Sequence, residues 1–341
     1  MLVMSVTDRI PLSSDSFKRN ISGIQDKTPG AKGLAMTTTT SSSPKKEQEN
    51  PRLGSAGLRF RSILVATDCS PASEIAVKLA ARVAKESHAK LYVLHATLPE
   101  LYGVEMRGPV PELELADLQN ARENLHRYVE HIPELRTVKH KEIAFLGSAS
   151  KAIQSAGESN DIDLLVLGSH GRHGLGKLTL GSVAEWAIRR LAYPVLVAGP
   201  MCDKSLRPIR SIVLATDLSE RASRSALYAS SMAQDYNARL TVLKVLPQAG
   251  TTGEQNQAES STRKTLHQLV PSDCGEQCTL NFEAKTGEVV PAILSSAQIN
   301  QANLIVLGAK HRAPLADHVP RTRLSAIIRE SHCPVLVVPA H

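Results

Sequence analysis

The chain has 341 residues, of which 42% are hydrophobic and 21% are charged, and its formal net charge at pH 7 is +7. This length is comfortable for two domains of ordinary size, and the composition excludes fibrous, collagen-like and disulfide-stapled chains. No stretch approaches the roughly 20 consecutive apolar residues of a membrane span. Asp8 and Arg9 interrupt the N-terminal apolar residues where a signal peptide would have its core. We therefore expect a cytoplasmic protein that does not contact the membrane.

Residues 1–57 are expected to form a disordered tail. They are rich in Ser, Thr, Gly, Pro and charge and show no periodicity, so they cannot bury enough apolar area to offset the entropy of ordering. The tail holds eight Lys or Arg and five Asp or Glu, which leaves a net charge of +4 for the other 284 residues. This excess is diffuse and aromatic residues are scarce, so the composition argues against nucleic-acid binding.

The five cysteines are scattered along the chain. They are Cys69, Cys202, Cys274, Cys278 and Cys333. Cys274 and Cys278 are separated by three residues, where the common zinc knuckle has two. We therefore expect reduced thiols and no metal site.

Two copies of one sequence pattern follow the tail. SILVATDCS, which begins at Ser62, recurs 149 residues later as SIVLATDLS, and LLVLG, which begins at Leu164, recurs 140 residues later as LIVLG. The second copy is therefore nine residues shorter in its middle. We place the excess in a loop of the first copy, near Pro99–Pro111, where Pro and Gly are frequent. The predicted domains are residues 58–200 and residues 208–341.

Within each copy, short apolar runs alternate with longer helical patterns. The runs of the first copy lie at residues 62–67, 90–96, 137–145, 163–168 and 194–199. Continuous β-branched runs are typical of strands buried on both faces, and strands that are separated by helices pair in parallel. We expect an α/β fold with two tandem, open, five-stranded parallel sheets sandwiched between helices. Ser70 followed by Pro71 predicts the start of the first helix.

A glycine-rich segment follows the fourth apolar run of the first copy. It reads GSHGRHGLGKLTLGS from Gly168 to Ser182. Ligands of open parallel sheets bind beyond the carboxyl ends of the strands, and glycines there let backbone amides approach an anion closely. Gly181 begins the next helical pattern, whose unpaired N–H groups favour phosphate. The segment therefore predicts polyphosphate binding.

Two other phosphate-binding motifs explain this segment less well. Gly171 to Lys177 has the GxxxxGK spacing of a P-loop, but Leu178 stands where Mg²⁺ binding needs Ser or Thr. A dinucleotide fingerprint would need GxGxxG directly after the first strand, where the sequence ATDCSPA contains no glycine. We treat the P-loop match as chance and exclude a Rossmann dehydrogenase.

The glycine spacing G-x2-G-x9-G-S from Gly168 to Ser182 resembles the nucleotide-binding type of the universal stress protein family. Asp68, at the end of the first strand, and a closing PVLV strand add to the resemblance. It covers residues 58–200 fully and residues 208–341 in outline. The resemblance implies a tandem member with the adenine nucleotide alpha hydrolase-like fold of that family. It also implies binding of ATP, with Mg²⁺ left open.

The resemblance assigns roles to residues of the first copy. Those implied for the phosphates and ribose are Gly168, Ser169, His170, Gly171 and Arg172, with Gly181, Ser182 and Val183 at the start of the next helix. Those implied around the adenosine are Ala66, Thr67 and Asp68. Ala96 is implied to meet the adenine edge through its backbone. For Asp68, capping of the turn before Ser70 stays open as an alternative.

The second copy departs from this pattern. It keeps Asp217 and Gly308, but His311 and Arg321 replace two of the glycines. A Cβ at each position obstructs close approach of a phosphate, so we expect one nucleotide per chain, in the first domain. For Asp217, capping of a turn is the favoured explanation.

Three functions are compatible with these patterns. The favoured one is an ATP-binding stress-response module in which the nucleotide biases conformation or the choice of partner. A slow ATPase is the second, but Glu185 and Glu288 lack a partner carboxylate or nucleophile, so we expect no enzyme. The third is a nucleotide-independent scaffold, an intramolecular pseudo-dimer joined through the PVLV strands at residues 194–197 and 334–337. A homodimer stays open.

Overall fold

The computed structural model describes most of both copies. The described residues are 59–98, 111–169, 180–219, 222–248, 250–271, 274, 278–310 and 322–340. All of them fall within residues 51–341, which group into one unit by their contacts. The predicted tail, residues 1–57, lies outside the described residues. So do residues 99–110 of the predicted loop and residues 170–179 of the glycine segment.

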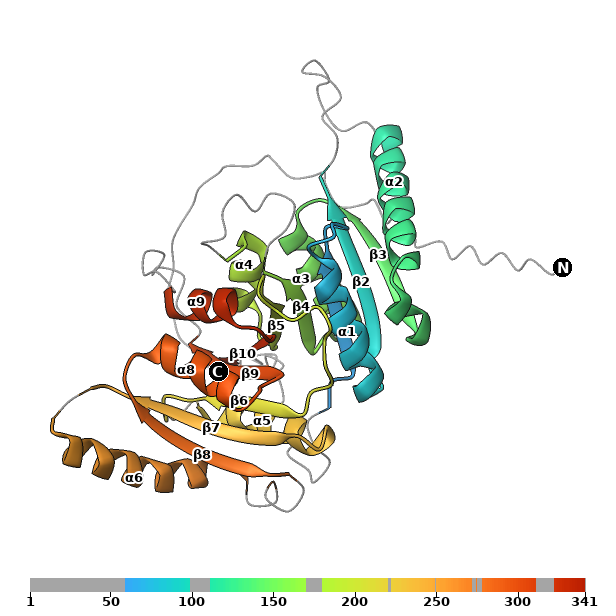
Figure 1. Cartoon of the computed structure of the whole chain (residues 1–341). Helices are drawn as coiled ribbons and strands as arrows, with labels where there is room; N and C mark the ends of the chain where they lie inside the picture. Colours follow the sequence, from blue (N-terminus) through green and yellow to red (C-terminus); the bar gives the residue numbers. More distant parts are fainter. Residues whose placement is uncertain are drawn as a thin grey trace, which may run out of the picture. The chain divides into compact units, whose positions relative to one another are not determined.

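Five strands of the first copy form a parallel sheet in the order β3-β2-β1-β4-β5 (Figure 1). They are β1 (Ser62–Thr67), β2 (Lys90–Thr97), β3 (His140–Leu146), β4 (Leu164–Gly168) and β5 (Val195–Ala198). Ile63 and Leu64 are consecutive in β1 and both fully buried, as expected for a strand covered on both faces. The strand expected at 137–145 begins only at His140, because Pro133–Thr137 form a 3-10 helix, η1.

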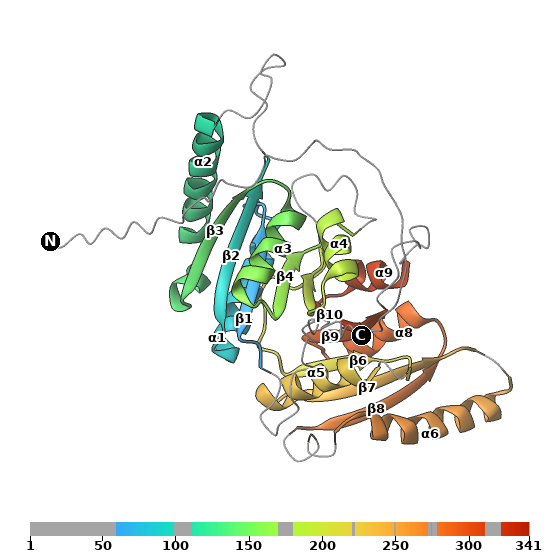
Figure 2. The same cartoon turned by 180° about the vertical axis from the view of Figure 1, so that it is seen from behind.

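Helices cover both faces of this sheet. Those of the first copy, besides η1, are α1 (Glu74–Ser87), α2 (Pro111–Glu130), α3 (Ala149–Asn160) and α4 (Ser182–Arg190). Helices α1 and α2 bury their apolar side chains in one core cluster, and α3 and α4 in another on the opposite face (Figures 1 and 2). The prediction that the first helix starts at Ser70 is wrong. The Ser70 hydroxyl donates to Asp68 at 2.6 Å, a turn follows, and α1 begins at Glu74.

The second copy repeats this arrangement in the sheet order β8-β7-β6-β9-β10. Its strands are β6 (Ser211–Ala215), β7 (Arg239–Leu246), β8 (Leu280–Thr286), β9 (Leu304–Lys310) and β10 (Val335–Ala340). Its helices are α5 (Ala222–Asp235), α6 (Thr252–Leu269), α8 (Val289–Ile299) and α9 (Thr322–Glu330). Ile63 pairs with Leu91, and the residues 149 positions later, Ile212 and Leu240, pair in the same way. The predicted fold of two five-stranded parallel sheets is confirmed.

The two sheets join edge to edge through their last strands. β5 and β10 pair antiparallel, with Leu196 opposite Leu336, so that the ten strands form one continuous sheet. This pairing removes two exposed sheet edges, each of which would otherwise present unpaired N–H and C=O groups. The predicted contact between the PVLV segments is therefore confirmed. The repeats alone did not predict that this contact joins the two sheets into one continuous sheet.

Side chains also connect the two copies near a pseudo-two-fold axis. Ser87 and Tyr236 occupy equivalent positions, 149 residues apart, and the Ser87 Oγ lies 3.3 Å from the Tyr236 hydroxyl. A contact between equivalent positions is the mark of an isologous interface. Arg224 of α5 donates to the carbonyl oxygen of Ala192 in the first copy at 3.2 Å, and to that of Pro339 in its own copy at 3.3 Å. The chain thus builds internally the type of contact that a symmetric dimer makes between subunits.

A polar cluster fastens α8 to β8 in the second copy. Glu283 of β8 accepts hydrogen bonds from Ser296 at 2.8 Å and from Asn300 at 2.9 Å, and the Lys285 ammonium lies 3.1 Å away. Burial raises the pKa of Glu283, but the bonds from Asn300 and Ser296 and the charge of Lys285 outweigh it and hold that pKa below its ordinary value. The ionised carboxylate is therefore the stabilising form.

Glu283→Gln should lower the free energy of unfolding by about 1 kcal/mol at pH 7, because a neutral amide is a weaker acceptor than a carboxylate. A depressed folded-state pKa gives a contribution that is complete above the ordinary Glu pKa and is lost as pH falls through the folded value. The difference between variant and wild type should thus be smaller at pH 3, below the ordinary Glu pKa, than at pH 7. Urea unfolding at pH 7 and at pH 3 measures this difference in the free energy of unfolding. Glu114→Gln, at an exposed position of α2, is the control, and an equal deficit of Glu283→Gln at both pH values would contradict the prediction.

Candidate functional site

The predicted site segments meet at the carboxyl edge of the first-copy sheet. β1 lies between β2 and β4, and the chain leaves β1 toward β2 but later crosses to β4 on the other side. Such a reversal of strand order opens a crevice beyond the carboxyl ends of the strands, where open α/β sheets bind ligands. Ala66 of β1 pairs with Leu167 of β4, and Thr67 pairs with His95 of β2. The ends of three neighbouring strands therefore meet at this switch point.

A hydrogen-bonded turn follows β1. Thr67 is buried and its Oγ1 accepts the N–H of Cys69 at 3.0 Å, while Cys69 itself has a φ of 59°. The Asp68 Oδ1 accepts the N–H of Ser70 at 3.0 Å and the Ser70 hydroxyl at 2.6 Å. Side-chain bonds of this kind hold a turn in one conformation. The capping alternative for Asp68 is thus realised, and Asp68 holds the turn at the carboxyl end of β1.

Two residues that were not among the predicted site residues support this turn: Ser73, directly before α1, and Tyr128 of α2. The Ser73 hydroxyl donates to the carbonyl oxygen of Ser70 at 2.9 Å and lies 2.7 Å from the Thr67 Oγ1. The Tyr128 hydroxyl lies 3.2 Å from the Ser73 Oγ, and burial raises the pKa of Tyr128, so the phenol stays protonated near neutral pH. The signal available for Ser73 is a Ser two residues before Ile75, the first apolar residue of the helical pattern.

The end of β2 provides one predicted and one unpredicted residue. Ala96 is half-buried at the carboxyl edge and pairs with Phe145 of β3, so its backbone lies where the adenine contact is expected. His95 was not predicted; it is buried, and its Nδ1 lies 3.0 Å from the carbonyl oxygen of Thr67. This contact ties the end of β2 to the end of β1. A polar residue near the carboxyl end of the apolar run KLYVLHA was the available signal.

The N-terminus of α4 lies against the end of β4. Ser169, which follows Gly168, donates its N–H to the carbonyl oxygen of Ala198 at 2.9 Å, and the N–H of Gly181 donates to the carbonyl oxygen of Ser169 at 2.8 Å. No side chain caps α4, and the first N–H groups of a helix have no intrahelical acceptor. Ser182 is exposed and Val183 is half-buried at this helix start. Amide donors and the positive end of the helix dipole therefore face the switch point.

Gly181 has the backbone of an ordinary N-cap residue. Its φ is −59° and its ψ is 146°, an extended conformation that any residue adopts. The backbone at Gly181 thus does not itself require a glycine. His170, Gly171 and Arg172, together with the P-loop-like segment, lie outside the described residues, so their roles stay predictions.

The second copy forms the same turn after β6. Thr216 Oγ1 accepts the N–H of Leu218 at 3.1 Å, and Asp217 Oδ1 accepts the N–H of Ser219 at 2.9 Å. The capping explanation of Asp217 is therefore confirmed. Lys244 takes the place that His95 has in the first copy, and its Nζ donates to the carbonyl oxygen of Asp217 at 3.0 Å. The two copies thus share a turn but differ in the side chain beside it. His311 and Arg321 lie outside the described residues.

Two further classes of site concern metal ions and thiols in the described part of the chain. Among its residues, no group of three or more His, Cys, Asp or Glu side chains is placed to hold a metal ion. Cys274 and Cys278 have sulfur atoms 2.8 Å apart, and burial raises the pKa of Cys278 to about 12, so this thiol stays protonated at neutral pH. The described helices include none that is both long enough and apolar enough to cross a membrane.

The sequence matches a family model and curated relatives. The model, described as the universal stress protein family, matches residues 59–199 and 208–339. Universal stress protein A homolog 1 of Coxiella burnetii is 34% identical over 131 residues, which cover 38% of this chain and 88% of that protein. Universal stress protein YxiE of Bacillus subtilis is 29% identical over 153 residues, which cover 40% of this chain and 98% of that protein.

Solved structures show the same tandem architecture. A universal stress protein from Archaeoglobus fulgidus aligns with 83% of this chain and 100% of its own, with a TM-score of 0.60 and 20% identity. A putative universal stress protein from Pseudomonas aeruginosa aligns with 82% of this chain and 93% of its own, with a TM-score of 0.55 and 20% identity. At this identity the likeness concerns the fold. Because the family model matches most of the chain in two consecutive segments, the chain belongs to the universal stress protein family, as a member with two tandem domains.

Proposed function

We propose that the first domain binds ATP at the carboxyl edge of its sheet and that the nucleotide regulates the protein as a non-enzymatic stress-response module. The phosphates would meet the first N–H groups of α4, and Mg²⁺ would arrive with them. The adenosine would lie against the ends of β1 and β2, at Ala66 and Ala96. The main support is the bond from the Gly181 N–H to the Ser169 carbonyl oxygen, which places a helix N-terminus without an obstructing side chain at the switch point.

Packing behind α4 offers a route from the nucleotide to the rest of the protein. Ala184, Ala187 and Ile188 of α4 belong to the same buried cluster as Ile327 and Ile328 of α9, in the other domain. A ligand that binds the ordered first turn of α4 more tightly than a frayed one shifts the population toward the ordered state. The shift would reach the packing between the domains through this cluster. A partner that contacts both domains would then sense the nucleotide.

Isothermal titration of the full chain with ATP tests the proposal. We expect saturable binding near one equivalent per chain, because only the first copy has the complete glycine pattern. The preparation is first assayed for nucleotide that co-purifies, since a site already filled would lower the measured stoichiometry. A nucleotide-free chain that does not bind millimolar ATP would overturn the proposal. Two equivalents would show that the second copy also binds, despite His311 and Arg321.

A nucleotide-independent scaffold is the second candidate, and the β5–β10 pairing favours it. The continuous sheet and the core cluster shared by α4 and α9 join the domains through contacts of the chain itself. In that case the protein would remain a monomer with an unchanged melting temperature and unchanged protease sensitivity when ATP is added. A nucleotide-regulated module would show protection at α4 and at the strands between the domains.

We also propose, from its cysteines, that the protein lies in the cytoplasm. Cys202, Cys274, Cys278 and Cys333 are free thiols, and burial raises the pKa of Cys202 to about 12 and that of Cys333 to about 11. Free thiols of this kind persist in a reducing compartment.

A further inference from the structure

Two cysteine side chains of the second copy meet where the chain passes from α6 to β8. The sulfur atoms of Cys274 and Cys278 lie 2.8 Å apart. This is closer than the roughly 3.5–4.0 Å at which two carbon atoms make their best contact, although sulfur is the larger atom. A disulfide bond has a length of about 2.05 Å. The separation of the two sulfur atoms therefore lies between a packing contact and a bond.

The backbone of this pair already has a geometry that a disulfide accepts. The N–H of Cys278 donates to the carbonyl oxygen of Cys274 at 3.0 Å. A bond of this spacing closes one helical turn and sets the two Cα atoms about 6 Å apart. Disulfides usually join residues whose Cα atoms are about 4.4–6.8 Å apart. A change of side-chain rotamers is therefore enough to form the bond.

The two thiols differ in exposure, which gives them different roles. Cys274 is fully buried in the core of the second copy, and its Sγ lies 3.9 Å from the carbonyl oxygen of Ser230 in α5. Cys278 is half-buried, and its Sγ lies 2.9 Å from the carbonyl oxygen of Cys274. A reagent from solvent therefore reaches Cys278 first. Cys274 is then the neighbour that can displace the reagent.

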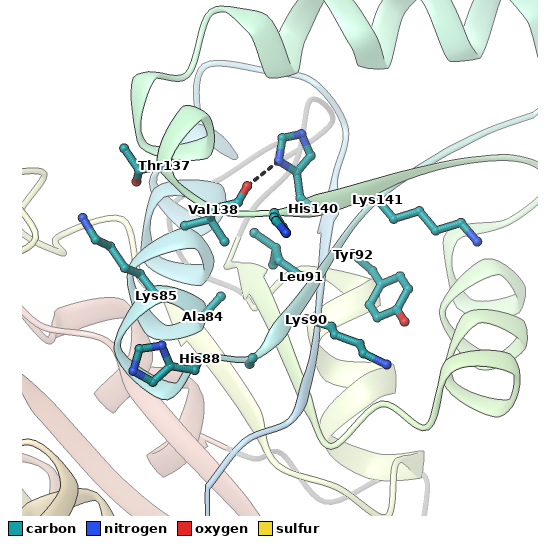
Figure 3. A pocket seen from close by; sticks show the side chains of 12 residues that line it. Ala84, Lys85, His88, Lys90, Leu91, Tyr92, Thr137, Val138, His140 and Lys141 are labelled. Carbon is teal, nitrogen blue, oxygen red and sulfur yellow. Dashed lines mark hydrogen bonds between the residues drawn. The ribbon is translucent and has the colours of Figure 1, made fainter. Parts of the chain in front are cut away.

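The first copy shows that the fold does not need these thiols. β3 begins at His140 and β8 at Leu280, and these residues occupy equivalent places in the two sheets. Val138 therefore corresponds to Cys278, two residues before the strand, and it lines a hollow of the first copy (Figure 3). Residues 131–139, which lead from α2 to β3, contain no cysteine. The pair of thiols is thus a property of the second domain and not of the architecture.

We propose that Cys274 and Cys278 form a reversible disulfide by exchange with a low-molecular-weight disulfide, such as glutathione disulfide. The Cys278 thiolate attacks one sulfur of the reagent, whose S–S bond breaks, so that a mixed disulfide forms and one small thiol leaves. Cys274 then gives up its proton and attacks the Cys278 sulfur, which releases the second small thiol. Each departing thiolate takes up a proton that a cysteine has lost. Two protein thiols are oxidised, and one small disulfide is reduced to two thiols.

The surroundings of the pair make this exchange slow but favour its product. Burial and the neighbouring Cys274 raise the pKa of Cys278 to about 12. Because the thiolate is the attacking form, the exchange is slow near neutral pH. Disulfides that are strong oxidants are those whose reduced form is stabilised, and a pair that stays protonated lacks that stabilisation. The pair would therefore respond to a sustained rise in small disulfides and not to a brief one.

The test is equilibration of the reduced full chain with millimolar glutathione disulfide at pH 8, followed by denaturation and alkylation. One tryptic peptide, residues 265–285, carries both cysteines and no other. We expect this peptide to lose two hydrogens and to take up no alkylating group, which is a loss of two of the five thiols of the chain. Excess glutathione should restore both thiols. The same end point should be reached from the reduced and from the oxidised chain.

Single variants test the order of the two steps. Cys274→Ala should stop at the mixed disulfide, so that the peptide gains one glutathione on Cys278. Cys278→Ala should leave the buried Cys274 unmodified. Cys274→Ser replaces Cys274→Ala if circular dichroism shows misfolding, because its hydroxyl can also donate to the Ser230 carbonyl oxygen. Cys202→Ala removes another buried thiol and should keep the disulfide of residues 265–285 unchanged.

Three results would overturn the proposal. The first is a pair that stays reduced at equilibrium with excess glutathione disulfide. The second is a wild-type chain that stops at the mixed disulfide on Cys278, since Cys274 would then not reach it. The third is loss of the disulfide in Cys202→Ala to the same extent as in Cys274→Ala. The experiment uses no nucleotide, so its outcome is independent of whether the first domain binds ATP.

Discussion

Gly181→Val is expected to weaken ATP binding roughly 100-fold while the domain stays folded. The branched side chain would fill the space in front of α4 and keep the phosphates from its N–H groups. Each hydrogen bond to a charged group contributes about 1.5–3 kcal/mol, and about 1.4 kcal/mol corresponds to tenfold in affinity. Because Gly181 has a φ of −59°, valine adds no backbone strain, and the cost to folding should be about 1 kcal/mol. Isothermal titration and thermal melts measure the two effects.

Two further variants test whether ATP binding depends on backbone approach at Gly181 or on a positive charge there. Gly181→Arg introduces the residue that the second copy has at this position, and it should also lose ATP if backbone approach matters more than a cation. Gly308→Ala changes the glycine of the second copy that corresponds to Gly168; its Cβ would make an ordinary contact of 3.4 Å with the Ser225 Oγ. ATP binding should be unchanged in this control. Wild-type affinity in Gly181→Val would contradict the placement of the phosphates at α4.

The sequence predicted the architecture because its dominant signals are local. Apolar runs that are separated by helical patterns indicate parallel strands. The repeat of the pattern indicates that two such domains follow each other along the chain. The predicted starts of α1 and β3 are wrong because other local interactions compete with the pattern that predicted them. Ser70 has the chemistry of an N-cap, but the carboxylate of Asp68 binds its hydroxyl, so α1 begins later. The run that starts at residue 137 is apolar enough for a strand, but η1 takes its first residue.

The candidate site was predictable only in its backbone part. The ends of β1, β2 and β4 and the start of α4 follow from the strand order together with the glycine spacing. The side chains that hold the turn come from elsewhere: Tyr128 is 55 residues from Ser73 in sequence, and its contact depends on how α2 packs against α1. Hydrogen bonds of this kind depend on tertiary structure, so the periodicity of the sequence does not predict them.

Gly199→Ala should lower the free energy of unfolding by about 2–3 kcal/mol, through the junction of the two domains. Gly199 directly follows β5, and a Cβ there would clash with the carbonyl oxygen of Ile328 in α9. That oxygen belongs to a helix backbone and cannot rotate away, so α9 or the end of β5 must shift. The shift would loosen the β5–β10 ladder, where Leu196 and Leu336 are almost fully buried. Denaturant unfolding measures the loss.

Hydrogen exchange shows where Gly199→Ala destabilises the sheet, and Gly253→Ala is the control. Amides of β5 and β10 should exchange faster in Gly199→Ala, while those of β2 and β3, which pair at the far end of the sheet, should keep their rates. Gly253→Ala, in α6, places a Cβ with no atom within 4 Å and should be neutral or stabilising by up to about 1 kcal/mol. If Gly199→Ala were as stable as Gly253→Ala, the close approach of β5 to α9 would not be part of the junction. If exchange accelerated equally in all strands, the domains would unfold as one unit, and the junction would carry the stability of both.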